Sequence, residues 1–164
     1  MNVLHVSIDV VSLITVIQMI VTMVAYYFWG NLNAKYSTRK VLYWTLPFIA
    51  IACLSWVGLL VLPVYAVLIM VHFFLGIGLG GFNQLVFNFI IGDTPKSERP
   101  MFIAVYSALT GFAAFLGPLV GGWLYGLVSD APMWVQSFGI AVTAGAVLLM
   151  LAFTYGRIIF NIKQ

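Results

Sequence analysis

The side chains that could act chemically in this chain are mostly neutral, and they recur at helical spacing. Hydroxyl, amide and aromatic groups follow one another at helical intervals, which on the first of three helices confine them to an arc of about 120°. Together with one histidine they form three faces, which predict a water-filled path that holds a small solute. The candidate cavity residues are Thr15, Gln18, Thr22 and Tyr26 on the first face, His72, Asn83, Gln84, Phe87 and Asn88 on the second, and Ser107 and Thr110 on the third.

A second interpretation of these faces stays open, in which the polar groups only join helices or bond their own backbone. Serine and threonine hydroxyls often donate to a carbonyl of the preceding turn. Hydrogen bonds between membrane helices contribute only about 0.6 kcal/mol each. Amides are different, because they have four hydrogen-bonding positions that are costly to leave unmatched in hydrocarbon. Gln18, Asn83, Gln84 and Asn88 therefore carry most of the prediction.

The ionisable residues argue against catalysis. The two histidines, His5 at the outer N-terminus and His72 in mid-membrane, form no triad, dyad or metal cluster with other residues, so we expect no catalytic site, no metal site and no cofactor. His72 falls deep within an apolar run and is either a proton carrier or a neutral link between helices. No Asp or Glu falls in the interior of such a run, because Asp9 lies at the outer start of the first one, so the usual proton-coupling carboxylate is absent from the expected helix interiors.

The elements that must position these groups are membrane helices. The chain has 164 residues, of which 63% are hydrophobic and 7% charged, too few polar side chains to cover a water-soluble core. Because a bilayer requires about 20 apolar residues per helix, five runs qualify. The expected fold is an all-α membrane protein, a single transmembrane domain over residues 1–164, with helices at 8–29, 41–62, 64–92, 101–127 and 134–156.

The basic residues predict how the chain crosses the membrane. They occur in the first and third gaps between apolar runs and after the last run, and cytoplasmic loops are the ones that collect Lys and Arg. We therefore expect the N-terminus outside and the C-terminus in the cytoplasm. This orientation explains the net charge of +3, so a nucleic-acid partner is not expected. The seven cations are Lys35, Arg39, Lys40, Lys96, Arg99, Arg157 and Lys163.

Small residues mark the predicted contacts between helices. Residues 76–81 match the dinucleotide pattern G-x-G-x-x-G, but they fall inside an apolar run, so a packing or hinge element is the better interpretation. The fourth run carries rows of small residues at four-residue spacing, which allow helices to approach closely in lipid. We expect that helix to be packed in protein on more than one side. The candidate packing residues are Gly76, Gly80, Gly117, Pro118, Gly121 and Gly122.

Two segments resemble the major facilitator superfamily. Residues 30–40 resemble its signature turn G-x-L-x-D-R-x-G-R-R/K, although Ala34 replaces the acidic residue and Ser37 the second glycine. Residues 95–99 and 117–122 resemble the P-x-x-x-R and G-P-x-x-G-G patterns of its tenth-to-eleventh loop and eleventh helix. The resemblance implies helices eight to twelve of twelve, an incomplete C-terminal six-helix bundle. The loop residues that carry it are Gly30, Lys35, Arg39, Lys40, Pro95 and Arg99.

The resemblance also implies a function. Transporters of this kind move a solute by rocking two six-helix halves around a midplane site. The chain would then be the C-terminal part of a secondary transporter, inactive without its N-terminal half. Tyr26, Phe87 and Tyr106 beside neutral amides suit sugars, drugs or small metabolites. The expected partners are the lipid bilayer, the missing half and the solute, and the expected location is a bacterial cytoplasmic membrane. Two other functions stay open: a membrane scaffold or accessory subunit that docks on a larger partner, and an oligomeric channel.

Overall fold

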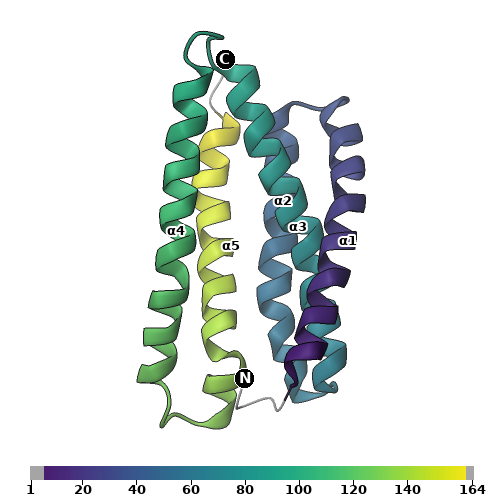
Figure 1. The fold of residues 1–164 in the computed structure, drawn as a ribbon, viewed down its shortest axis with the longest axis vertical. Coiled ribbons are helices and arrows are strands. Elements are labelled where there is room, and N and C mark those ends of the chain that lie inside the picture. Colours follow the sequence, from purple (N-terminus) through teal and green to yellow (C-terminus); the bar gives the residue numbers. More distant parts are fainter. Residues whose placement is uncertain (1–5, 162–164) are drawn as a thin grey trace.

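Five membrane-length helices make up the part of the chain that the computed structural model describes, residues 6–161 (Figure 1). This confirms the predicted all-α membrane fold. The second helix tightens into a 3-10 turn at its end, and the fifth begins with a π-helical turn. The elements are α1 Ile8–Asn33, α2 Thr38–Leu54 with η1 Ser55–Leu60, α3 Val64–Asp93, α4 Arg99–Leu127, and η2 Val135–Gly139 with α5 Ile140–Asn161.

The helices run alternately up and down, so the start of α1 and the end of α5 lie at opposite ends of the bundle (Figure 1). The α1–α2 turn, the α3–α4 loop and the end of α5 share one end. That end therefore collects the basic turns around Arg39 and Arg99. Which side of the membrane it faces stays a prediction. Lys163 and His5 lie outside the described residues.

Helix α1 ends later than its sequence-based boundary. Helix α1 continues to Asn33 rather than stopping near residue 29, because nothing in Gly30 to Asn33 prevents helical hydrogen bonding. The Leu32 carbonyl then accepts hydrogen bonds from the backbone N–H groups of Lys35 and Tyr36, at 3.0 and 2.9 Å, which closes the turn. The signature-like segment is thus half helix and half turn.

The glycine run of α3 lets two neighbouring helices approach it closely. A Cβ on Gly76 would lie 2.9 Å from the Gln18 carbonyl oxygen of α1, and one on Gly80 would lie 3.2 Å from the Thr22 methyl. On another side of α3, a Cβ on Gly78 would lie 2.6 Å from Ile49 of α2. Helix α3 stays unbroken through these positions, so the run serves packing and is not a break.

A buried tryptophan joins the three helices. Trp29 of α1 is 2% exposed and donates its indole N–H to the Ile77 carbonyl of α3 at 2.9 Å. A Cβ on Gly81 would lie 2.5 Å from that indole nitrogen, so glycine is what makes room for the ring. Val41 of α2 and Leu85 of α3 complete the core cluster around it.

Helix α4 stands apart from this core. None of its residues is buried. No heavy atom of the described residues comes within 4 Å of the position that a Cβ would take on Gly117, Gly121 or Gly122. The expectation that this helix packs in protein on more than one side is therefore wrong for the described residues, because no helix there covers that face. For Gly117, Pro118, Gly121 and Gly122, a packing role remains a prediction that requires a segment beyond residues 6–161.

Replacing one glycine of α3 should destabilise the helix bundle. In Gly76→Ala the new methyl group meets a backbone oxygen that cannot move alone, so we expect a loss of about 1–3 kcal/mol in unfolding free energy. Gly111→Ala is the matched control, because its Cβ would enter open space. It should be neutral or gain up to about 1 kcal/mol from helix propensity. Thermal unfolding followed by circular dichroism in detergent measures both, and equal changes would contradict this packing.

The predicted orientation can be tested with cysteine labelling in a Cys53→Ala background. Lys96→Cys should react with a membrane-impermeant maleimide only after cells are permeabilised, because its loop is expected in the cytoplasm. Val61→Cys, in the α2–α3 turn and 86% exposed, should react in intact cells. The opposite pattern would reverse the orientation.

Candidate functional site

Three helices border an open cavity of about 480 Å³ that has several polar groups in its wall. Its wall is formed by Tyr26 of α1, by Asn83, Gln84 and Phe87 of α3, and by Tyr106 of α4. Four of these five belong to the predicted cavity set. The sequence indicated Tyr106 only as an aromatic group that suits a solute. Tyr106 lies one turn before Thr110 on the third polar face, and this spacing is the signal that would have included it in the predicted cavity set. The wall carries amides, phenols and one phenyl ring, with no charged side chain.

Gln84 gives the cavity a hydrogen-bond acceptor without a partner. Its side-chain oxygen is buried and accepts no hydrogen bond from the described residues. A Cβ on Gly30 would lie 3.3 Å from the Gln84 side-chain nitrogen, so Gly30 gives the amide room to lie against α1. An unmatched buried acceptor costs about 1–3 kcal/mol. A solute that donates a hydrogen bond to this oxygen would recover that cost.

The hydroxyl groups behave as the second interpretation expects. Thr15, Thr22 and Thr110 each donate to a carbonyl of their own helix, at 2.8 to 2.9 Å. Thr22 also lies 3.3 Å from the Gly76 carbonyl oxygen of α3. None of these residues lines the cavity, and neither do Ser107 or Asn88.

His72 and Gln18 form a separate polar link between α3 and α1. The His72 Nδ1 lies 2.6 Å from the Gln18 side-chain oxygen. An amide oxygen only accepts, so Nδ1 carries the proton and donates in this assignment. The close contact of Gly76 and Gly80 with α1 lies between this pair and the cavity. The predicted polar set therefore divides into two groups along the same pair of helices.

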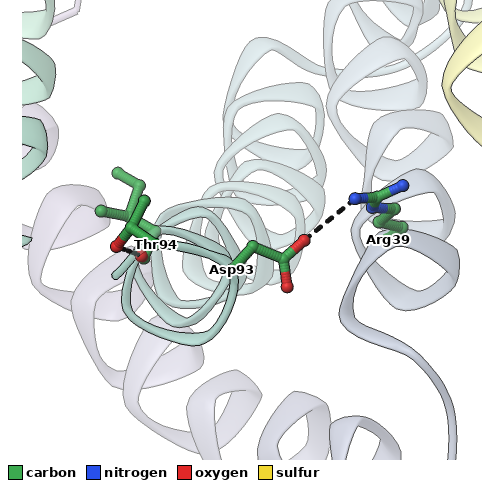
Figure 2. Close-up of polar contacts among 4 residues, drawn as sticks. Arg39, Asp93 and Thr94 are labelled. Atoms are coloured by element: carbon green, nitrogen blue, oxygen red, sulfur yellow. Dashed lines mark hydrogen bonds and ion pairs between the residues drawn. The ribbon is translucent and has the colours of Figure 1, made fainter. Parts of the chain in front are cut away.

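The basic end of the bundle is held by an ion pair. Arg39 at the start of α2 lies 3.0 Å from the Asp93 carboxylate at the end of α3 (Figure 2). The guanidinium also lies over the Phe89 ring, 5.3 Å from its centroid. The signature turn of the family carries an acid where this chain has Ala34; here a carboxylate from α3 pairs with the arginine. This contact joins α2 and α3. It contributes little to stability, because both side chains are partly exposed.

The α3–α4 loop is closed by the other motif residues. The Pro95 carbonyl accepts hydrogen bonds from the backbone N–H groups of Glu98 and Arg99, at 3.0 and 3.2 Å. The Arg99 side chain donates from Nε to the Thr94 carbonyl at 3.3 Å, and the Thr94 hydroxyl donates to the Ile90 carbonyl (Figure 2). Pro95 and Arg99 thus shape the loop and do not reach the cavity.

Five helices of membrane length and an uncharged cavity wall agree with a membrane protein of a transporter family. The chain belongs to the Major Facilitator Superfamily, whose family model matches residues 1–158. It is therefore a transporter-family protein and not an enzyme.

A similar curated protein is the MFS-type efflux transporter phmH of Phaeosphaeria nodorum, which is 36% identical over 80 residues. The match covers 46% of this chain and 14% of that relative's length. The chain thus spans a small part of the relative it matches. No solved structure matches the chain.

A double-mutant cycle should detect the His72–Gln18 hydrogen bond. His72→Phe and Gln18→Leu each remove one partner, and the coupling free energy should be about 0.6 kcal/mol and below about 1.7 kcal/mol, as for other bonds between membrane helices. Unfolding free energies of the parent, both single variants and the double variant in detergent provide the measurement. A coupling of zero would mean that the two side chains do not interact in the folded protein.

Proposed function

We propose that the chain is the C-terminal part of a secondary transporter, corresponding to helices eight to twelve of the major facilitator fold. It moves a small uncharged solute by alternating access, and it requires an N-terminal half for activity. The observation that carries this proposal is the cavity between α1, α3 and α4, whose wall has no charged side chain. The α3–α4 loop and the Gly117–Gly122 pattern support the helix assignment.

The chemistry of the cavity supports a neutral solute with both hydroxyl groups and a ring. The amide groups of Asn83 and Gln84 can each accept and donate hydrogen bonds. Tyr26 and Phe87 are each about two-fifths exposed and offer ring faces to an apolar part of the solute. A charged solute would be desolvated there without a counter-charge, which is costly. Sugars, neutral drugs and small metabolites all meet these requirements.

The uncovered face of α4 supports the need for further helices. Its small residues at four-residue spacing suit close packing against another helix, and no described residue fills that space. The same face would also suit a scaffold or accessory subunit that docks on a larger membrane protein, which is the second candidate function. Affinity purification from detergent separates the two. A transporter half as the recovered partner supports our proposal, whereas a single unrelated membrane protein supports the scaffold.

The membrane in which the protein works is part of the proposal. A bacterial cytoplasmic membrane was expected from the sequence, where no Asn-x-Ser/Thr acceptor occurs. The curated relative comes from Phaeosphaeria nodorum.

Transport should depend on the cavity and on the missing half. We expect cells that express the chain alone to accumulate a neutral fluorescent glucose analogue, which has both hydroxyl groups and a ring, as vector controls do. Cells that express it joined to an N-terminal half of a major facilitator transporter should change that accumulation. In the joined protein, Asn83→Ala and Tyr26→Phe should each lower the transport rate by about fivefold, the loss of one hydrogen bond of about 1 kcal/mol.

Tyr27→Phe is the matched control, because Tyr27 is the next residue of α1 but is 78% exposed and outside the cavity wall. It should leave the rate unchanged. Equal effects of Tyr26→Phe and Tyr27→Phe, or transport by the chain alone, would contradict the proposal.

A further inference from the structure

A second hollow in the molecule is an apolar groove on the opposite side of α1 from the cavity. It has a volume of about 510 Å³ and lies between α1 and α2, over α3. At 100° per residue, Phe28 in its wall points away from Tyr26. The larger side chains of the wall are Ile20, Val24, Phe28, Phe48, Phe73 and Ile77.

The groove points toward the basic end of the bundle. From Phe28, one four-residue step along α1 leads to Leu32, a rise of about 6 Å, and the turn that follows the helix carries Tyr36. From Phe48, four-residue steps along α2 lead through Trp44 to Lys40. The two rows meet at that end, where the ring centroids of Tyr36 and Trp44 are 5.2 Å apart. Leu32 and Trp44 pack against the core cluster below them.

The meeting point carries unbalanced positive charge. The Lys40 ammonium lies 5.2 Å from the Tyr36 ring centroid and 5.4 Å from that of Trp44. These aromatic rings hold the ammonium by cation–π attraction and leave N–H donors for another ligand. Asp93 is already paired with Arg39. Among residues 6–161, neither Lys40 nor the neighbouring exposed Lys35 has a carboxylate partner.

We propose that this surface binds one anionic phospholipid, with an acyl chain in the groove and the phosphate at Lys35 and Lys40. Along α1 the groove wall runs from Phe28 back to Ile20, a rise of about 12 Å away from the basic end, so the groove lies within the about 30 Å hydrocarbon core at acyl-chain depth. Tyr and Trp are the residues that settle at headgroup level. Lysines near the membrane surface attract anionic lipids.

A helix of a partner protein fits this groove less well than a lipid does. Helices pack closely in membranes through small residues, whereas this groove is walled by Phe28, Phe48 and Phe73. A partner helix would also leave the two lysines without a counter-charge. The flexible tail and the phosphate of a lipid match the groove and its basic end together. The proposal does not depend on which solute the protein carries.

Native mass spectrometry of the purified chain tests the proposal. The chain is mixed in detergent with equal amounts of phosphatidylglycerol and phosphatidylcholine that carry the same acyl chains. We expect one phosphatidylglycerol to be retained in preference to phosphatidylcholine. Lys35→Ala and Lys40→Ala should each weaken its binding by about fivefold. Lys96→Ala, which removes a cation from the other basic loop, is the matched control and should have no effect.

A groove-filling variant tests the acyl-chain half of the site. Val24→Trp should abolish retention of phosphatidylglycerol with both lysines intact, while Met23→Trp, at an exposed neighbour outside the groove, should not. Equal retention of the two lipids, or a loss in Lys96→Ala as large as in the lysine variants, would overturn the proposal. Retention of phosphatidylglycerol in Val24→Trp would also overturn it. A loss of phosphatidylglycerol in Val24→Trp without any effect of Lys35→Ala or Lys40→Ala would overturn it too, because that result would indicate an apolar occupant such as a partner helix.

Discussion

The close approach of α1 and α2 to α3 is the constraint on which the rest of the structure depends. In lipid, apolar burial between helices gives no driving force, so association relies on tight van der Waals contact and on a few hydrogen bonds. Gly76 and Gly80 permit this contact with α1, and Gly78 and Gly81 permit it with α2 and with Trp29. Without that approach neither the His72–Gln18 bond nor the wall of the cavity would form.

The three packed helices create two surfaces of different chemistry. On one side of α1, Tyr26 faces the amides of α3 and the phenol of Tyr106, which makes an open cavity with polar groups in its wall. On the other side, Phe28 faces α2 across an apolar groove. A helix rotates by 100° per residue, so positions two apart face nearly opposite directions. A single helix can in this way contribute to a proposed solute site and to a proposed lipid site.

The sequence predicted much of this arrangement because its signals are physical and local. Hydropathy revealed five spans, and polar periodicity identified Tyr26, Asn83, Gln84 and Phe87 as facing one space. It did not separate Thr15, Thr22 and Thr110 from that set, because a threonine that bonds its own helix has the same spacing as one that lines a cavity. Nor did it predict that α4 lacks neighbours among the described residues, since small residues mark a packing surface without saying what covers it.

Water accessibility at the centre of the cavity tests most directly whether α1, α3 and α4 border a solvent-filled site. Two cysteine variants, Asn83→Cys and Met23→Cys, are compared in a Cys53→Ala background. The two positions lie equally far from the basic end of the bundle, where α1 and α3 both end, but only Asn83 lines the cavity. A charged methanethiosulfonate reagent, added to permeabilised membranes, should modify position 83 rapidly and position 23 hardly at all. Equal, slow reaction at both positions would mean that Asn83 faces lipid or protein and that the cavity does not hold water.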